Sequence, residues 1–403
     1  MAVEIRTLDP DDLDQLADLG AHSFGGPRPE MVLEQRPIPP EEAVAAYDGD
    51  RLVGHVAAHR FRQWFGGRAV PCGGVAGVMV MPDQRGSGLA ARMMAAMTEA
   101  MRERGDVVSA LYPTTASLYR SVGYEVAGWW GRRAVDVAEL APPAGDVTWR
   151  RVEAGAPEVA AVYERCARGR DGWVVPTAPW WVSWAVGLDR GTNWVWIGDR
   201  ESTDTRMPVS EPVAVVAYGH AKGERRLNDL DAHLVAGIDG PALAEALAFL
   251  GSNGTTADRL RTTLPGPVLA RHVAQASRLP TLEDWPWMLR LIDLPGAIAA
   301  RGWPAGLALE VTLRVSAPAR VPDDPAAGDW TLRVAGGGAT CEPAPSGESG
   351  AVEVAVGDLA ALYSGHLDPA ALVDEGRLRG ATPEVVSGLR AAFAGSPTLP
   401  IFF

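Results

Sequence analysis

The sequence predicts a mixed α/β (α+β) fold that is divided among several domains. The chain has 403 residues, which exceeds the length of about 250–300 residues that a single hydrophobic core usually serves. Stretches with the two-residue alternation of strands are followed repeatedly by stretches with helical spacing. The composition, 47% hydrophobic and 22% charged, is that of an ordinary globular protein and not of a disordered one.

Charge and cysteine content narrow the class of protein. The formal net charge of −13 argues against a nucleic-acid-binding surface and favours cationic partners. The first residues lack the basic and then apolar pattern of a signal peptide, and no apolar run approaches the roughly 20 residues of a membrane-spanning helix. The three cysteines lie far apart and form no metal-ligand pattern. We therefore expect a cytoplasmic protein that contacts no membrane and holds no metal.

The first part of the chain alternates strands and helices in a regular order. Residues 3–8 alternate like a half-buried strand, and residues 10–19 repeat apolar residues at helical spacing. Two hairpins follow, with turns at 48–50 and at 66–67. The next expected elements are a helix over 89–104, a strand over 107–112, a short helix around residue 119 and a strand after residue 123.

One stretch, 77–94, has the pattern of a strand, an anion-binding loop and a helix. Glycine at positions 86 and 88 lets backbone N–H groups approach a phosphate, and the start of the helix adds partial positive charge. Arg85 supplies a cation beside these donors. The stretch lacks the lysine of a Walker loop, and it fits a dinucleotide fingerprint poorly because Ala91 stands in the last glycine place. An ordinary glycine turn is the alternative for this loop.

A second pattern, 115–125, consists of a short helix that carries Tyr119, a glycine stop and a strand. A tyrosine hydroxyl has an ordinary pKa of about 10, near that of an alkyl thiol, so proton transfer between the two groups is nearly balanced in energy. Tyr112 and Tyr124 are weaker candidates for such a transfer. The alternative for Tyr119 is a partly buried core residue.

The middle part begins after a linker at 142–145 and repeats the strand and helix order of the first part. Its expected elements are a strand over 147–152, a helix over 157–168, strands over 194–197, 213–220 and 229–236, and a helix over 241–251. Where a phosphate-binding loop would stand, the sequence has only Gly237-Ile238-Asp239-Gly240-Pro241. The tryptophans at 173, 180, 181 and 184 favour a core or interface role, with a cation-binding aromatic cage as the alternative.

The last part begins at a second boundary near 282–298. Its expected elements are strands over 288–292, 307–315, 331–334 and 351–356, and helices to residue 300 and over 356–364, 368–375 and 383–393. The sequence ends in an apolar tail, Leu399-Pro400-Ile401-Phe402-Phe403. A sheet with terminal helices of this kind resembles the sterol-carrier fold.

The first part resembles the Gcn5-related N-acetyltransferases. Arg85-Gly86-Ser87-Gly88-Leu89-Ala90 matches their Q/R-x-x-G-x-G/A motif, and residues 115–124 match their A-x-x-x-Y-x-x-x-G-[FY] signature, with threonine in the alanine place. The resemblance implies that acetyl-coenzyme A binds at the loop and that Tyr119 protonates the thiolate. The coenzyme-binding residues that it implies are Val78, Met79, Val80, Arg85, Gly86, Ser87, Gly88, Leu89 and Ala90.

The whole chain resembles the Eis (enhanced intracellular survival) family, in which two acetyltransferase units precede a sterol-carrier-like domain that ends in phenylalanine. This resemblance implies a catalytic domain over 1–143, a second acetyltransferase-like domain without the pyrophosphate loop over 144–286, and a sterol-carrier-like domain over 287–403. It also implies that the terminal carboxylate of Phe403 helps to deprotonate the acceptor amine, and that the protein forms a homo-hexamer.

The hypothesis that follows is an N-acetyltransferase that moves acetyl from acetyl-coenzyme A to a primary amine by direct attack in a ternary complex. Neither pattern contains a cysteine that would form an acetyl-enzyme. Residues 23–29 hold no acidic residue before Glu30, unlike the family members that acetylate aminoglycosides. This departure argues against an aminoglycoside-specific pocket, so the expected acceptor stays open among an aminoglycoside, a polyamine and a lysine-like amine. The competing hypothesis is a non-catalytic protein that binds acyl-coenzyme A or lipid.

Overall fold

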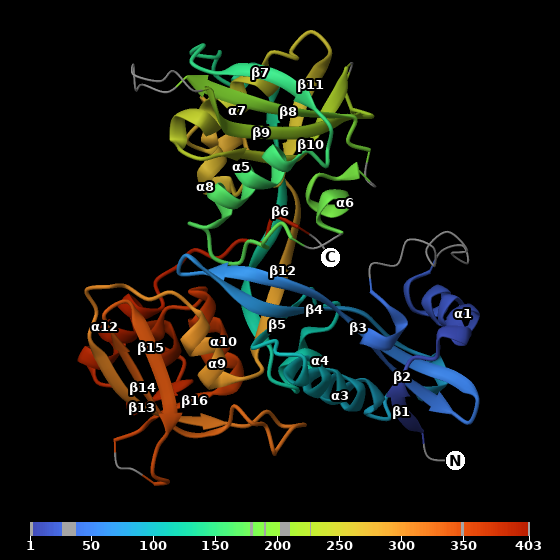
Figure 1. Cartoon of the computed structure of the whole chain (residues 1–403), viewed down its shortest axis with the longest axis vertical. Coiled ribbons are helices and arrows are strands. Elements are labelled where there is room, and N and C mark those ends of the chain that lie inside the picture. Colours follow the sequence, from blue (N-terminus) through green and yellow to red (C-terminus); the bar gives the residue numbers. More distant parts are fainter. Residues whose placement is uncertain are drawn as a thin grey trace. The chain divides into compact units, whose positions relative to one another are not determined.

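The computed structural model describes residues 3–25, 38–177, 180–188, 191–201, 210–225, 227–347 and 350–401. The chain forms two compact units (Figure 1). Unit 1 consists of residues 1–128 and 286–397. Unit 2 consists of residues 129–285 and the tail segment that starts at Thr398.

Unit 1 contains the sheet that leads into the predicted anion-binding loop. Its strand order is β1-β2-β3-β4-β5-β12. The strands are β1 (Glu4–Thr7), β2 (Ala43–Asp48), β3 (Arg51–Phe65), β4 (Arg68–Val80), β5 (Val108–Leu111) and β12 (Thr281–Leu291), of which residues from Pro286 onward belong to this unit. Strands β3 and β4 form a long hairpin closed by Gly66 and Gly67, whose φ angles of 57° and 78° belong to the left-handed region that this turn requires. Strand β3 runs without a break from Arg51 to Phe65, so the two predicted hairpins share one long strand.

Helices cover both faces of this sheet. They are α1 (Leu13–Phe24), α3 (Leu89–Glu103) and α4 (Ala116–Arg120), with short 3₁₀ turns η1 (Pro10–Asp12), η2 (Pro40–Glu42) and η3 (Pro82–Gln84). Four methionines of α3, at 93, 94, 97 and 101, recur at helical spacing and pack against Val53, Val56 and Val75 of the sheet. On the other face, Leu16 and Leu19 of α1 pack in a cluster with Met79. The apolar period of each helix thus fixes which face of the sheet it covers.

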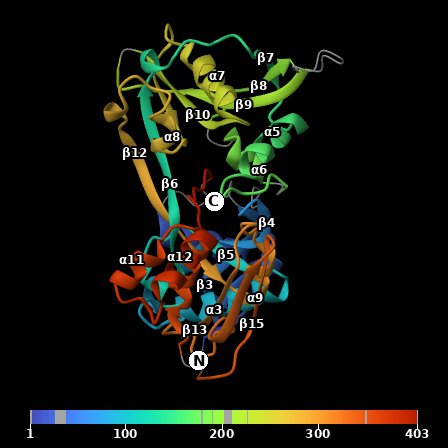
Figure 2. The same cartoon turned by 90° about the vertical axis from the view of Figure 1, so that its left-hand side faces the viewer.

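The C-terminal part of unit 1 is a second sheet with helices beside it (Figures 1 and 2). The sheet has the order β15-β14-β13-β16-β17. Its strands are β13 (Leu309–Ser316), β14 (Gly328–Ala335), β15 (Gly338–Pro343), β16 (Val352–Ala355) and β17 (Leu378–Arg379). The helices are α9 (Leu294–Ala300), α10 (Val356–Ser364), α11 (Pro369–Asp374) and α12 (Pro383–Ala392). The sequence predicted each of these elements except β15 and β17.

Unit 2 has a sheet of the order β6-β11-β10-β9-β8-β7. The strands are β6 (Glu125–Asp136), of which residues from Trp129 onward belong to this unit, β7 (Thr148–Val152), β8 (Trp194–Glu201), β9 (Ser210–Ala221), β10 (Asn228–Gly237) and β11 (Ala257–Thr262). The helices are α5 (Pro157–Ala167), α6 (Trp181–Ala185), α7 (Gly240–Gly251) and α8 (Gly266–Leu269), with 3₁₀ turns η4 (Val137–Glu139) and η6 (Ala276–Arg278). Trp173 and Trp181 are buried and pack on the Tyr163 ring, at centroid distances of 5.1 and 4.8 Å, as core residues do.

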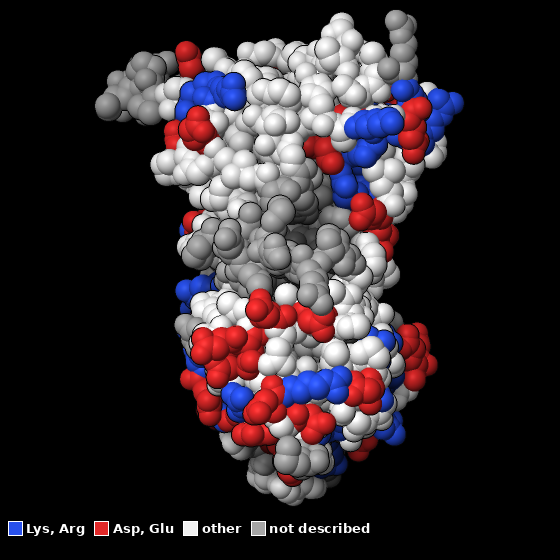
Figure 3. All heavy atoms as spheres, turned by 90° about the vertical axis from the view of Figure 1, so that its right-hand side faces the viewer, with Lys and Arg blue, Asp and Glu red and all other residues white. Residues whose placement is uncertain are grey.

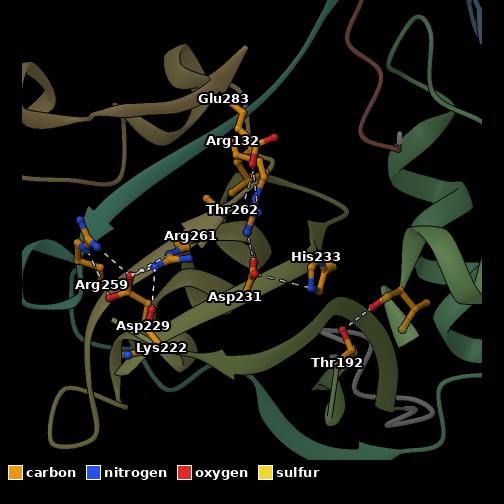
Figure 4. A network of polar contacts seen from close by, with 12 residues as sticks. Arg132, Thr192, Lys222, Asp229, Asp231, His233, Arg259, Arg261, Thr262 and Glu283 are labelled. Carbon is orange, nitrogen blue, oxygen red and sulfur yellow. Dashed lines mark hydrogen bonds and ion pairs between the residues drawn. The ribbon is translucent and has the colours of Figure 1, made fainter. Parts of the chain in front are cut away.

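A polar network ties three strands of unit 2 together (Figure 4). The carboxylate of Asp229, on β10, is fully buried and pairs with Arg259 at 3.0 Å and Arg261 at 2.6 Å, both on β11. Two residues along β10, Asp231 pairs with Arg132 of β6. Because each carboxylate has its guanidinium partner, the buried charge is neutralised across the sheet.

Candidate functional site

The predicted anion-binding loop leads from β4 through η3 into α3. Gly86 and Gly88 have φ angles of 80° and 82°, a conformation that costs other residues energy. Gly88 is the N-cap residue of α3, and the first backbone hydrogen bond of the helix runs from the N–H of Arg92 to the Gly88 carbonyl at 3.2 Å. The N–H groups of residues 89–91 therefore have no acceptor within the helix, and glycine has no side chain to cap them. These donors are open to an anion.

A pocket of about 440 Å³ lies at this helix start. Its lining residues are Val80, Gln84, Arg85, Gly86, Gly88, Leu89, Ala90, Ala91, Ser117, Leu118, Ser121 and Arg320. The structure thus brings six of the nine predicted coenzyme residues to one pocket, together with the short helix that carries Tyr119. Of the other three, Met79 packs against α1 on the opposite face, and the Ser87 hydroxyl donates to the Gln84 carbonyl at 2.7 Å. Val78 packs against the core that contains α3.

Two arginines give the pocket its charge. The Nε of Arg85 donates to the Val80 carbonyl at 3.3 Å, and Arg320 comes from the loop between β13 and β14. Within the ranges that the structure describes, neither arginine pairs with a carboxylate. Asp83, the carboxylate nearest to Arg85 in the sequence, pairs instead with Arg51 at 2.8 Å, and this hydrogen bond lowers the pKa of Asp83 below its ordinary value. The pocket therefore suits an anionic ligand.

Strand β4 separates from β5 before it reaches the loop. The parallel pairing of the two strands ends at Gly74 opposite Ala110, whereas β4 continues to Val80 with β3 as its neighbour. Gly77, with a φ of 61°, interrupts the regular strand, and Nδ1 of buried His55 donates to its carbonyl at 2.8 Å. The β5-facing backbone groups of residues 75–80 can accordingly pair with an extended ligand, as an added strand would.

Tyr119 lies on α4 with its ring in the core of unit 1. Its side chain is 5% exposed, and burial raises the pKa of its hydroxyl to about 12. Among the described residues its hydroxyl has no hydrogen-bond partner. Tyr124, whose ring lies 6.2 Å away, differs because its hydroxyl donates to Ser109 Oγ at 2.7 Å. Tyr119 does not line the pocket itself, although Ser117, Leu118 and Ser121 of the same segment do.

A buried ion pair that the sequence did not reveal fixes the turn after α4. Arg290, on β12, is 1% exposed and donates to Asp324 Oδ2 at 2.5 Å and to the Val122 carbonyl. The backbone N–H of Arg320 also donates to the Ser121 carbonyl, at 3.0 Å. Two segments from the last part of the chain thus hold the turn that positions Tyr119. No local pattern could have shown this, because the partners are far apart in the sequence.

The corresponding helix of unit 2, α7, is closed to an anion. Its first free N–H groups are capped by Asp239, whose carboxylate accepts from the Ala242 N–H at 2.7 Å. The same carboxylate pairs with Arg200 at 2.8 Å. A negative side chain therefore occupies the place that the glycine loop leaves open in unit 1, which is a physical reason for the predicted lack of a coenzyme site there.

Some predicted features lie outside the described residues. These are Phe403, Glu30 and most of the loop that was expected to line the acceptor pocket. In the described ranges, no three His, Cys, Asp or Glu side chains are grouped so that they could hold a metal ion. Nor does any helix there have the length and apolar character that crossing a membrane demands.

Comparisons with known proteins bear on the same regions. Residues 4–127 match the acetyltransferase (GNAT) domain and residues 294–402 the sterol carrier protein domain. An uncharacterized N-acetyltransferase of Streptomyces griseus is 28% identical over an alignment of 422 positions, which covers 94% of this chain and 93% of that protein. The GCN5-related N-acetyltransferase from Kribbella flavida has a TM-score of 0.82 at 28% identity, with 100% of this chain and 98% of that chain covered.

Eis1 from Mycobacterium abscessus has a TM-score of 0.78 over 100% of both chains at 17% identity, which shows a shared fold. These findings confirm the predicted mixed α/β fold and the prediction that the protein is an enzyme. The chain is an N-acetyltransferase with a GNAT domain at its N-terminus and a sterol carrier protein domain at its C-terminus.

Proposed function

We propose that the enzyme transfers acetyl from acetyl-coenzyme A to a primary amine by direct attack in a ternary complex. The observation that carries the proposal is the pocket at the start of α3, where free backbone N–H groups and Arg85 converge with no carboxylate beside them among the described residues. The coenzyme diphosphate binds at Arg85, Gly86, Ser87, Gly88, Leu89 and Ala90. Its pantetheine arm runs along Val78, Met79 and Val80, next to the open edge of β4.

Tyr119 is the proton donor in this proposal. The amine nitrogen attacks the thioester carbonyl, the C–S bond breaks, and the Tyr119 hydroxyl gives its proton to the departing sulfur. The tyrosinate then recovers a proton from the solvent or from the acylated amine. A hydroxyl with a pKa of about 12 is protonated throughout the neutral range, so Tyr119 is ready to donate at the pH of the cell.

The acceptor amine must lose a proton before it attacks. We propose the terminal carboxylate of Phe403 for this step, on the strength of the resemblance to the Eis family, to which we assign the chain. A cationic acceptor is supported by the acidic residues of η1 and α1, which are Asp11, Asp12, Asp14 and Asp18. Figure 3 shows that acidic side chains gather on the lower part of the face that it views. The class of amine, whether aminoglycoside, polyamine or lysine-like, is the open part of the proposal. Hexameric assembly and a cytoplasmic location belong to it as predictions.

The test is thiol release from acetyl-coenzyme A with a panel of aminoglycosides, polyamines, arylamines and lysine peptides. The wild type should release thiol with at least one amine class, and Arg85→Ala should raise the Michaelis constant for the coenzyme with little change in saturated turnover, because the phosphate contacts are the same in the ground and transition states. An unchanged Michaelis constant in Arg85→Ala would contradict the proposed coenzyme site.

A second candidate function is the binding of acyl-coenzyme A or lipid without catalysis, which the sterol carrier protein match favours. It predicts that the coenzyme raises the melting temperature while no amine of the panel releases thiol.

A further inference from the structure

Arg320 reaches the coenzyme pocket from the sterol carrier part of the chain. It lies between β13 and β14, in a turn closed by a backbone bond from Val321 N–H to the Pro318 carbonyl at 3.0 Å. Its own N–H donates to the Ser121 carbonyl at 3.0 Å. Both bonds belong to the backbone, so they fix where the side chain starts without using its guanidinium group.

The guanidinium of Arg320 lies against Gly88, the N-cap residue of α3. A Cβ atom placed on Gly88 would lie 3.1 Å from Arg320 Nη1, whereas one on Gly86 would meet nothing within 4 Å. Gly88 therefore serves the site in two ways: its φ of 82° forms the loop, and its missing side chain leaves room for the guanidinium. Both arginines line the same pocket.

This placement is unfavourable for the protein alone. The N-terminus of a helix carries partial positive charge, and Arg85 stands on the same loop, so Arg320 adds a third source of positive potential. Arg320 is exposed, and no described carboxylate pairs with it. A structural arginine is usually held by a carboxylate, as Arg290 is by Asp324 at 2.5 Å. An anion in the pocket would be attracted by all three positive groups at once.

We propose that Arg320 binds a phosphate group of coenzyme A, so that the sterol carrier domain supplies part of the coenzyme site. This inference rests on the proposed binding of the coenzyme at the α3 loop. The phosphate is either the diphosphate or the 3′-phosphate of the adenosine, and the two share the chemistry that a guanidinium recognises. Arg320 is a positioning residue in this scheme, since it is far from the thioester end of the ligand along β4.

The experiment measures the dissociation constants of acetyl-coenzyme A and of its analogue without the 3′-phosphate for the wild type, Arg320→Ala, Arg320→Lys and Arg85→Ala. We expect Arg320→Ala to weaken acetyl-coenzyme A binding by roughly tenfold or more, as the loss of a charged hydrogen bond does, and Arg320→Lys to retain much of the affinity. The Michaelis constant for the coenzyme should rise with little change in turnover. A diphosphate contact weakens both ligands equally, whereas a 3′-phosphate contact weakens only the complete coenzyme.

Arg379→Ala is the matched control, because Arg379 is an exposed arginine of the same domain with a side chain that is 73% exposed. It should bind both ligands as the wild type does, and no variant should melt at a lower temperature than the wild type without ligand. The inference is overturned if Arg320→Ala binds both ligands like the wild type while Arg85→Ala binds them weakly. If the wild type binds neither ligand, the proposed function itself fails.

Discussion

The two tyrosines of the 115–125 segment differ in what their hydroxyl groups can do. Burial raises the pKa of both. The Tyr124 hydroxyl is held by Ser109, whose own hydroxyl donates to the Gly73 carbonyl at 2.8 Å. That chain of bonds secures β5 to β4 near the point where the strands separate. Tyr124 thus has a structural task, and Tyr119 has a hydroxyl that is available for a ligand.

Replacing Tyr119 by phenylalanine should lower turnover by roughly 10²-fold, because the proton donor is lost while the ring remains. The Michaelis constants of both substrates should change little. The measurement is steady-state kinetics of Tyr119→Phe with an amine identified in the screen. Tyr124→Phe is the matched control, and it should lose about 1 kcal/mol of stability with its hydrogen bond while keeping most of its turnover. The reverse pattern would make Tyr124 the proton donor.

His59 gives a second prediction at this scale. It is 2% exposed on β3, and burial, with the nearby charge of Arg104, lowers its pKa to about 4. In the unfolded chain a histidine has an ordinary pKa near 6.5, so between about pH 4 and pH 6.5 the unfolded chain binds a proton at His59 that the folded chain does not bind. At pH 7 the histidine is neutral in both states. The free energy of unfolding should therefore fall as the pH drops from about 6.5 through 4, by about 3 kcal/mol at most.

Urea unfolding at pH 7.0, 5.5 and 4.5 measures this effect. The loss of stability between pH 7.0 and 4.5 should be smaller in His59→Gln than in the wild type, and His22→Gln, at an exposed position, should retain the wild-type slope. Equal slopes in all three proteins would show that carboxyl groups, not His59, dominate the acid sensitivity.

Single residues were predictable where the local pattern carried the chemistry. The glycines and Arg85 follow one another along the chain, so the loop could be read from spacing alone. Arg320 and the Arg290–Asp324 pair could not, because an arginine near prolines has no local signature and its partners come from distant segments.

Helix starts show how the two units differ at the scale of one element. The N-cap residue of α3 is a glycine, Gly88, and that of α7 is Asp239, although both helices come after a strand of a mixed sheet. The side chain of the N-cap residue decides whether the first N–H groups of a helix are hydrogen-bonded within the protein or remain available to an external anion.

Asp239→Ala tests this difference. The variant should lose about 1 kcal/mol of stability with the cap, and it should bind acetyl-coenzyme A as tightly as the wild type, because the proposed coenzyme site lies at α3. Asp239→Asn, which keeps a capping oxygen, should lose less. The measurements are urea unfolding and the dissociation constant of the coenzyme. A change in coenzyme affinity in either variant would place coenzyme contacts in unit 2.

Strands were predicted where apolar residues alternate and were missed where charged side chains find partners within the sheet. Strand β11, Ala257–Thr262, contains Arg259 and Arg261, which read as polar in the sequence but are neutralised by buried Asp229. Strand β15 lies at a sheet edge and buries one residue, Cys341, so it has no apolar period to detect.

At the scale of the whole molecule, the order of parts along the chain does not reveal which segments pack together. The sequence shows linkers near 142–145 and 282–298, but unit 1 joins residues 1–128 with 286–397. The division into domains at 143 and 286 stays a prediction based on the family resemblance.

The last prediction concerns the C-terminal tail and the proposed role of the Phe403 carboxylate. Leu399 and Ile401 are buried, and the Thr398 hydroxyl accepts from Trp173 Nε1 at 3.0 Å within unit 2. If the Phe403 carboxylate acts on the acceptor amine, a two-residue extension should abolish most turnover with an unchanged melting temperature. Deleting Phe403 moves the carboxylate by about 3.3 Å of chain and should do the same. Full activity of the extended enzyme would refute the role of the carboxylate.

The pocket shared by Arg85 and Arg320 has a consequence for the making of this enzyme. The two residues are separated by 235 positions (320 − 85). At a synthesis rate of about 5–20 residues per second, a ribosome needs roughly 10 to 50 s to add the second arginine after the first. Throughout that interval the nascent acetyltransferase domain has its loop but not its full pocket. The surface that we propose for the coenzyme is therefore completed only after most of the polypeptide has been translated.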